Sequence, residues 1–282
     1  MKNWVLAARP KTLLIGMAPV LLGGAIAFQL GSFDFPLYLC TLFCALTIQM
    51  GANLTNDFFD AKQGVDTNKR VGPTRAVASG LIQKTAMAKG IFLTFGFAAV
   101  LGSYLIFQGG AIFAFLLALS IAFAIFYTAG SHSLARIGLG DLVTLLFFGP
   151  IAVGGTIFLQ TKALYFPGIW LGFVPGLYSA AILNRNNIRD LEGDCEAGRK
   201  TIPVRFGRNV ALQLFSISIL VALILPIPYA MMTRKPLLML PSAIFLIPTI
   251  QLLQVQDDRI AFAKTPPLEF SFCLLLALCH FL

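Results

Sequence analysis

Long apolar stretches alternate with short polar ones along almost the whole of this 282-residue chain. The pattern predicts nine apolar helices, at residues 12–28, 36–55, 86–107, 110–128, 140–159, 166–184, 209–230, 236–254 and 266–282. Each approaches the ~20 residues that a helix needs to cross the hydrocarbon of a bilayer, although the last is short. An arrangement with eight spans stays open. The hydropathy pattern therefore predicts an all-α integral membrane protein with about nine transmembrane helices in one bundle.

The first apolar stretch follows Lys2, Arg9 and Lys11, an arrangement that a secretory signal peptide also shows. Pro19 and the many later spans favour a first helix that is retained in the membrane. No segment resembles a linker between domains. We therefore expect one domain over residues 1–282, built from two halves at roughly 1–135 and 136–282.

Composition and charge agree with a membrane protein. The chain is 57% hydrophobic and 12% charged, whereas a soluble domain carries roughly twice that charge. The net charge of +9 does not indicate nucleic acid, because the cations lie in loops between apolar runs, where a membrane surface accounts for them. The lipid bilayer is thus the expected partner of this surface.

The distribution of Lys and Arg predicts the orientation. With nine spans, 18 of the 21 cations fall on the side of the N-terminus; the other three are Lys162, Arg234 and Lys235. Cytoplasmic loops carry the excess of Lys and Arg, so we expect a multi-pass protein of the inner or plasma membrane with a cytoplasmic N-terminus. The long polar loops 2–3 and 6–7, which follow the second and sixth spans, would form a cytoplasmic cap.

Polar residues with helical spacing occur where the second span ends. Asn53, Asp57 and Asp60 are related as i, i+4 and i+7, and Asn56 lies one turn before Asp60, so they share one helical face. Carboxylates on one face repel each other unless a cation or ligand lies between them. The alternative interpretation is a solvated helix end with ordinary surface charge.

A similar pattern follows the sixth span. Asp190 and Asp194 are one turn apart and come after Asn186 and Asn187. The text Asp60-x-x-x-Gly64-x-x-Thr67 matches Asp194-x-x-x-Gly198-x-x-Thr201. The match suggests an internally duplicated site. Because four spans separate the two motifs, both should emerge on the cytoplasmic side.

The two motifs suit a metal-bound diphosphate. They contain seven of the twelve acidic residues: Asp57, Asp60, Asp66, Asp190, Glu192, Asp194 and Glu196. Mg²⁺ takes oxygen ligands, usually one or two carboxylates with water or phosphate, and two such ions would neutralise a diphosphate whose outer oxygens Arg and Lys clamp. His and Cys do not cluster for a softer metal, and no P-loop motif occurs.

The apolar spans around the motifs imply that the rest of the substrate is greasy. The aromatic candidates are Phe58, Phe59, Phe123, Phe126, Phe147, Phe148, Tyr127 and Tyr178. Their ring faces would stabilise an allylic carbocation, although most phenylalanines here are expected to face lipid or to pack helices.

These motifs resemble the UbiA superfamily of intramembrane prenyltransferases. The resemblance rests on Asn53-x-x-Asn56-Asp57-x-x-Asp60, Asp190-x-x-x-Asp194 and about nine spans. Within it, the chain is most similar to the menaquinone branch, the 1,4-dihydroxy-2-naphthoate polyprenyltransferases. The finer text behind this is Ala8-Arg9-Pro10-Lys11-Thr12, Gly64-Val65-Asp66, Arg70-x-Gly72-Pro73-x-Arg75, Ser79-Gly80, Tyr127-Thr128-x-Gly130, Gly138-x-Gly140-Asp141, Asn186-Asn187-x-Arg189-Asp190, Ala197-Gly198 and Thr201.

The resemblance implies a reaction and a site. Mg²⁺ on Asp57, Asp60, Asp190 and Asp194 would bind a polyprenyl diphosphate, and an aromatic acid would accept the prenyl group with loss of carbon dioxide. Asp66 would be a further catalytic carboxylate that orients the acceptor or a neighbouring group. The expected substrate-binding residues are Asn53, Asn56, Lys62, Arg70, Arg75, Tyr127, Asn186, Asn187, Arg189 and Lys200. Arg189 is open between the acceptor carboxylate and the diphosphate.

Two other functions remain as alternatives. One is a sibling enzyme that uses 4-hydroxybenzoate or a tetrapyrrole as acceptor. The other is a cation-coupled transporter, although transporter ion sites tend to lie near the midplane rather than at span ends. Asp141, at the start of the fifth span, is open between a helix-capping and a substrate role. Glu269 is expected at the membrane interface. His132, in a stretch where relatives often carry prolines, is open between a variable loop residue and a proton carrier.

Overall fold

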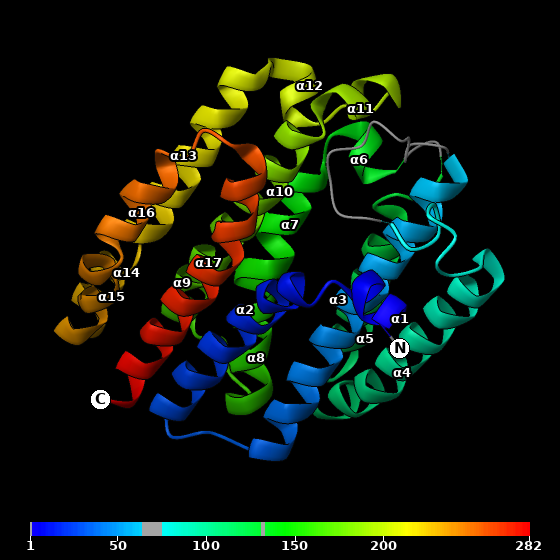
Figure 1. Ribbon diagram of the computed structural model, residues 1–282. Coiled ribbons are helices and arrows are strands. Elements are labelled where there is room, and N and C mark those ends of the chain that lie inside the picture. The colour runs from blue at the N-terminus through cyan, green and yellow to red at the C-terminus, as the bar shows by residue number, and fades with distance from the viewer. Residues whose placement is uncertain (1, 64–74, 131–132) are drawn as a thin grey trace.

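Figure 1 shows the fold of the protein as a computed structural model, which describes residues 2–63, 75–130 and 133–282. The first helices are α1 (Lys2–Ala8), α2 (Pro10–Gln29), α3 (Phe35–Gln63), α4 (Lys84–Gly109) and α5 (Ala111–Phe126). The middle ones are α6 (Leu134–Ile137), α7 (Gly140–Leu146), the π-helix η1 (Phe147–Ile151), α8 (Ala152–Thr161), α9 (Phe166–Leu171) and α10 (Phe173–Arg189). The last ones are α11 (Leu191–Glu196), α12 (Ile202–Phe206), α13 (Arg208–Ile224), α14 (Pro226–Thr233), the 3₁₀-helix η2 (Pro236–Met239), α15 (Leu240–Ile244), α16 (Leu246–Leu253) and α17 (Asp258–Phe281).

The all-helical fold predicted from the sequence is confirmed, since these ranges contain helices and no strand. Eight segments of the described chain are long and apolar enough to cross a membrane. The remaining apolar helix, α5, has only 16 residues, so the ninth span stays a prediction. Large apolar side chains such as Phe92 and Phe107 on α4 are almost fully exposed, as suits a surface that faces lipid.

Two helix ends differ from the expected limits in ways that matter for the site. Helix α3 continues past the apolar stretch to Gln63, so its last two turns carry the first acidic motif. Helix α17 begins at Asp258, eight residues earlier than expected, because the Asp257 carboxylate caps it by accepting from the N–H groups of Arg259 and Ile260.

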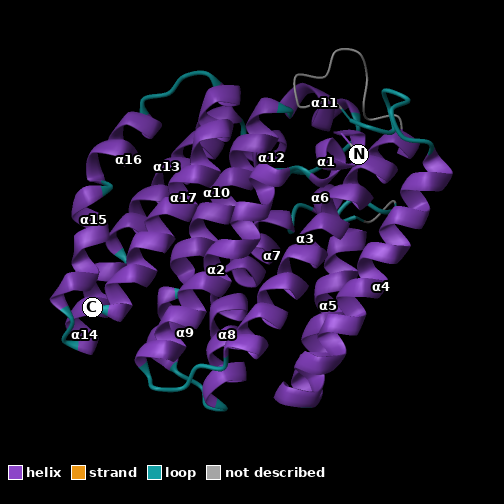
Figure 2. Cartoon of the chain, turned by 60° about the horizontal axis from the view of Figure 1, so that its bottom comes forward, coloured by secondary structure: helices purple, strands orange, loops and turns teal. Residues whose placement is uncertain are grey.

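The bundle is built around α2, α8, α10, α13 and α17. Their buried apolar side chains, including Leu22, Val153, Tyr178, Phe215 and Phe272, form one continuous core. In Figures 1 and 2, α14 to α16 lie on one side of this core and α3 to α5 on the other. The short helices α6, α11 and α12 gather at one end of the bundle, in Figure 1 at the top. A cap formed by loops 2–3 and 6–7 remains a prediction.

The span from α7 to α8 is interrupted at η1, where Gly149 and Pro150 break the regular helix. This interruption lies against α10 at a place where both segments carry a glycine, Gly149 in η1 and Gly176 in α10. A β-carbon on Gly176 would collide with the carbonyl oxygen of Leu145 and would lie 3.0 Å from Cα of Gly149. The absence of side chains therefore lets the two backbones touch beside the cavity described next.

Candidate active site

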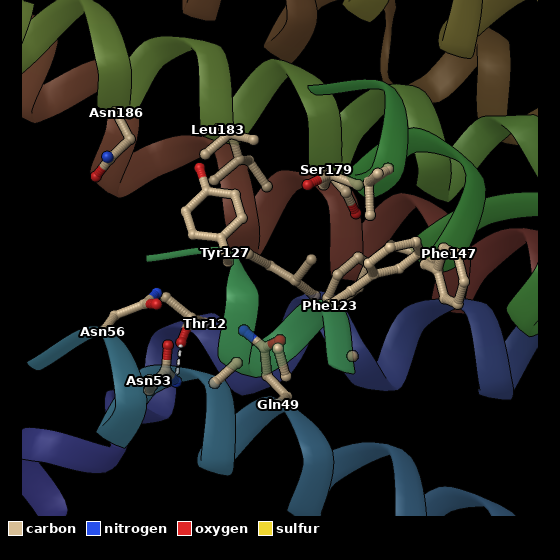
Figure 3. A pocket seen from close by; sticks show the side chains of 18 of the residues that line it. Thr12, Gln49, Asn53, Asn56, Phe123, Tyr127, Phe147, Ser179, Leu183 and Asn186 are labelled. Atoms are coloured by element: carbon tan, nitrogen blue, oxygen red, sulfur yellow. Dashed lines mark hydrogen bonds between the residues drawn. The ribbon is translucent and has the colours of Figure 1, made fainter. Parts of the chain in front are cut away.

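A cavity of about 350 Å³ lies between the helices, with polar groups at one end and aromatic rings at the other. Figure 3 shows Asn53, Asn56 and Asn186 on one side of it and Phe123 and Phe147 on the other. Its charged and amide-bearing wall includes Arg9, Asn53, Asn56, Asp60, Arg75, Asn186, Asn187, Asp190 and Arg199. Its aromatic end consists of Phe123, Phe147 and Phe148, whereas the rings of Tyr127 and Phe262 line it nearer the charged wall. This separation of charged and aromatic residues suits a molecule with an anionic head and a hydrophobic body.

The two acidic motifs meet at one guanidinium. Arg199 forms ion pairs with Asp60 on α3 at 2.5 Å and with Asp194 on α11 at 3.0 Å. Asp60 also receives a 2.6 Å ion pair from Arg75, and both side chains are buried. Residues 139 positions apart in the sequence thus share one charged cluster, which brings the two acidic motifs together.

Burial and charge act in opposite directions within this cluster. Burial raises the pKa of Asp194 to about 6, even though Arg199 opposes the shift. Burial alone would lower the pKa of Arg199, but the carboxylates of Asp60 and Asp194 raise it above its ordinary value. Arg199 is therefore a permanent cation held between two carboxylates.

Asp57 has different partners from Asp60, although the two lie on the same face of α3. Its carboxylate is buried and accepts from the backbone N–H groups of Ala76 and Val77, both at 2.9 Å. These bonds fix the segment that presents Arg75 to Asp60. In the structure Asp57 is an anchor for the segment after residue 74, and its role as a metal ligand stays a prediction.

Asp190 lies at the C-terminal end of α10 and faces the cavity. It is held by its neighbour, because Nε and Nη2 of Arg189 donate to its two oxygens at 2.8 and 2.6 Å. Nη2 of Arg189 also donates to the Asn186 side chain at 2.8 Å, and the guanidinium lies over the Phe262 ring. Asn187 is buried in the same wall. Asn186 and Asn187 thus line the cavity, whereas Arg189 lies outside its wall and binds the lining residues Asn186 and Asp190.

Asn53 and Asn56 hold backbone and hydroxyl groups around the cavity mouth. The Asn53 amide donates to the carbonyl of Ala8 at 2.8 Å and to the Thr12 hydroxyl at 2.9 Å. Between them, Arg9 has a left-handed backbone with φ of 52°, which breaks α1 from α2 and brings Arg9 into the cavity wall. The Asn56 carbonyl accepts from the Thr128 hydroxyl at 3.0 Å.

Several predicted site residues lie away from the cavity or outside the described residues. Lys62 and Lys200 are exposed and do not line the cavity. Asp66, Arg70 and His132 lie outside the described residues. Asp141 lies in the first turn of α7, but the cap position belongs to Leu139 and no side-chain capping bond occurs there. Each of these remains without an observed substrate role.

Sequence reasoning missed Arg199 and misplaced Glu269. Arg199 follows Gly198 in the second motif, directly before the predicted site residue Lys200, and nothing in the sequence distinguishes the two adjacent cations. Glu269 is not interfacial but fully buried in α17, where it accepts a hydrogen bond from Ser179. A carboxylate inside an apolar span was the available signal.

The donor set fits a magnesium ion that is bound together with a diphosphate. The oxygens of Asp60 and Asp194 already converge on one positive charge, that of Arg199. No group of three or more His, Cys, Asp or Glu residues in the described part of the chain could hold a metal. Mg²⁺ needs only one or two carboxylates when phosphate and water complete its shell. The number of ions stays a prediction.

The fold and the cavity define a multi-pass membrane protein with a charged chamber at one end of an apolar bundle. A model of the UbiA prenyltransferase family matches residues 16–273. The chain therefore belongs to the UbiA prenyltransferase family and is a membrane prenyltransferase, as its motifs predicted.

Relatives with known names are similar over most of their length. The 1,4-dihydroxy-2-naphthoate octaprenyltransferase of Haemophilus influenzae is 37% identical over 216 residues, which cover 73% of this chain and 70% of the relative. The enzyme of the same name from Bacillus subtilis is 33% identical over 217 residues, 77% of this chain and 70% of the relative. A solved UbiA homolog from Archaeoglobus fulgidus, bound to DMAPP and Mg²⁺, superposes with a TM-score of 0.65 over 98% of this chain and 99% of its own. At 16% identity that structure shows the shared fold.

Proposed function

We propose that this protein transfers a polyprenyl group from polyprenyl diphosphate to 1,4-dihydroxy-2-naphthoate, with loss of carbon dioxide, in menaquinone biosynthesis. The observation that carries the proposal is the Asp60–Arg199–Asp194 bridge at the polar end of an otherwise apolar cavity. The choice of acceptor is supported by the names of the relatives at 33–37% identity. The reaction needs an anionic head and a greasy chain in one site, and the division of the cavity wall provides for both.

The diphosphate binds at the charged cluster in this proposal. Asp60, Asp190 and Asp194 would hold Mg²⁺, which when bound would neutralise the charge that develops on the departing diphosphate. Asp57, whose oxygens accept from the backbone of Ala76 and Val77, would position Arg75 in this site. The guanidiniums of Arg75 and Arg199 would turn from the carboxylates to the phosphate oxygens, for which their fork geometry is suited. Use of Mg²⁺ agrees with the Archaeoglobus fulgidus structure. We expect two ions.

The prenyl chain lies along the aromatic end of the cavity. Phe123, Phe147 and Phe148 line the cavity beyond the polar end, and the faces of their rings would stabilise positive charge on the allylic carbon. The bond between this carbon and the diphosphate oxygen breaks, and its electron pair leaves with the diphosphate. The ring carbon that carries the carboxylate forms the new bond. Carbon dioxide then departs and leaves its electron pair to the ring, so no net proton is taken up or released.

The acceptor carboxylate requires a cation and amide partners near that carbon. Arg189 already donates to the Asn186 side chain at 2.8 Å. Both residues lie within one helical turn of Asp190, and Asn187 lines the cavity beside Asn186. Arg189 would bind either the acceptor carboxylate or the diphosphate. Asp66 and Arg70 would complete the site.

The test is a reaction with purified protein, Mg²⁺, a long prenyl diphosphate and either of two acceptors. With 1,4-dihydroxy-2-naphthoate we expect release of carbon dioxide and a prenylated naphthoquinol, and much slower turnover of 4-hydroxybenzoate. Prenylated 4-hydroxybenzoate as the preferred product, with its carboxylate retained, would replace the proposed acceptor and leave the prenyltransferase assignment standing.

A further inference from the structure

The hydroxyl of Ser179 has an unusual partner. Helical serines and threonines of this chain commonly donate to a carbonyl of their own helix three or four residues earlier, as Thr47, Ser120 and Thr265 do. Ser179 on α10 instead donates across to Oε1 of Glu269 on α17, at 3.1 Å. This bond joins two helices and ends on an acidic side chain inside the bundle.

Burying the Glu269 side chain at this position costs free energy. Its side chain is fully buried in a span, and its Oε2 atom has no hydrogen-bond partner within the described ranges. An acidic residue inside a membrane span indicates a functional role by default. Glu269 does not line the cavity, whereas Ser179 does, so any effect of Glu269 on a substrate passes through the Ser179 hydroxyl.

The Ser179–Glu269 bond decides whether the Ser179 hydroxyl donates or accepts a hydrogen bond in the cavity. A hydroxyl has one proton to donate and two lone pairs that accept. Because the proton of Ser179 is directed to Glu269, the oxygen is left to accept a hydrogen bond from a molecule in the cavity. Figure 3 shows Ser179 on the α10 wall, between Leu183 and the aromatic end.

The depth of Ser179 selects which substrate group reaches it. It lies seven residues before Asn186 on α10, roughly 10 Å further along the helix from the charged cluster. A diphosphate bound at that cluster does not extend to Ser179, and a prenyl chain has no donor to offer. An aromatic acceptor has ring hydroxyls that do.

Resting on the proposed function, we propose that Ser179, oriented by Glu269, recognises a ring hydroxyl of the aromatic acceptor. Ser179 contacts the acceptor, and Glu269 is a positioning residue that acts through Ser179. The pair would thus select acceptors with a hydroxyl at the deep end of the ring system, because a site that pairs with a hydroxyl discriminates against an analogue that lacks it.

The experiment compares acceptor analogues in a set of variants. The Michaelis constant is measured for 1,4-dihydroxy-2-naphthoate, and inhibition constants are measured for 1-hydroxy-2-naphthoate and 4-hydroxy-2-naphthoate, each of which lacks one hydroxyl. The unaltered protein should bind one analogue roughly tenfold more weakly than the other. Ser179→Ala and Glu269→Leu should bind the two equally, with an unchanged Michaelis constant for the prenyl diphosphate.

Two further variants separate recognition from a structural effect. Glu269→Gln keeps an oxygen that accepts from Ser179 and should retain the preference for one analogue. Thr265→Val removes a buried hydroxyl one turn away on α17, outside the cavity wall, and should also retain it. A preference that survives in Ser179→Ala, or is lost in Ser120→Ala instead, would overturn the assignment. Absence of any product from the naphthoate with the unaltered protein would overturn the proposed acceptor, and the assignment with it.

Discussion

At the scale of single residues, two aspartates one turn apart on α3 have different surroundings. Asp60 faces Arg75 and Arg199, whereas Asp57 turns to the backbone of Ala76 and Val77. A carboxylate that pairs with guanidiniums can exchange them for a metal ion and its diphosphate. One that holds backbone amides contributes to the position of a segment. The two residues should therefore differ when each is changed to asparagine.

The first prediction compares Asp60→Asn with Asp57→Asn by thermal unfolding. Mg²⁺ with geranylgeranyl diphosphate should raise the Tm of the unaltered protein, because a ligand that binds only the folded state stabilises it. Asp60→Asn should abolish this rise and lower turnover at least about a hundredfold. Asp57→Asn should lower the Tm without ligand by roughly 3 °C, since one amide loses its acceptor, but should keep the rise. Loss of the rise in both variants would place Asp57 in the metal site as well.

The second prediction concerns the adjacent cations Arg199 and Lys200. Arg199→Ala should raise the Michaelis constant for the prenyl diphosphate more than about tenfold, because it removes a cation from the charged cluster. The constant for the acceptor should change little. Lys200→Ala, one residue further and outside the cavity wall, should leave both constants within about twofold. Equal effects of the two substitutions would show that net charge, and not the position of Arg199, is what binds the donor.

At the scale of helices, the contact between η1 and α10 sets the shape of the cavity. Gly149 and Gly176 let the two backbones approach, and residues on either side, Phe147, Phe148 and Ser179, line the cavity. A side chain at this contact meets main-chain atoms, which cannot rotate away. The helices would have to separate, and the cavity wall would move with them.

The third prediction follows from this contact. Gly176→Ala should either greatly reduce the yield of folded protein or lower its Tm by several degrees. The reason is that the added β-carbon collides with the backbone at Leu145. The matched control is Gly96→Ala on α4, where no atom beyond the chain neighbours and the helix's own backbone lies within 4 Å of the added carbon. The control should be neutral or slightly stabilising, since alanine favours a helix over glycine. Comparable losses in both variants would contradict the proposed role of the contact.

At the scale of the whole molecule, charge is distributed unequally between the two ends of the bundle. Lys162 belongs to the end with few cations, where its ammonium donates to the Gln108 carbonyl at 2.9 Å and so joins the ends of α4 and α8. The acidic motifs and most of the cations lie at the other end, beside α11 and α12. The excess of Lys and Arg predicts that this end faces the cytoplasm.

The fourth prediction tests the orientation with a cysteine that the chain already has. Cys195 on α11 is exposed, whereas Cys44, Cys273 and Cys279 are buried and Cys40 is partly buried. An impermeant maleimide should label Cys195 only after the cells are opened. Lys235→Cys, made together with Cys195→Ala, should be labelled on intact cells. The reverse pattern would put the active site outside, away from cytoplasmic prenyl diphosphates.

The sequence by itself determined the fold class and the location of the acidic motifs. Hydropathy predicts apolar helices because a bilayer offers no hydrogen-bond partners to an open backbone. The spacing of Asn53, Asp57 and Asp60 placed them on one face of a helix, and all three are buried on α3. These properties are local, since they depend on neighbours within a few turns of the chain.

Only the tertiary structure decided which of these residues share a partner. The bridge through Arg199 joins positions 139 residues apart, and the Ser179–Glu269 bond joins positions 90 residues apart. Helical spacing fixes the direction of a side chain from its own helix, but the group that it meets depends on how the helices pack. For the same reason helical spacing does not distinguish Asp57 from Asp60. They differ because the segment at Ala76 and Val77 packs against Asp57.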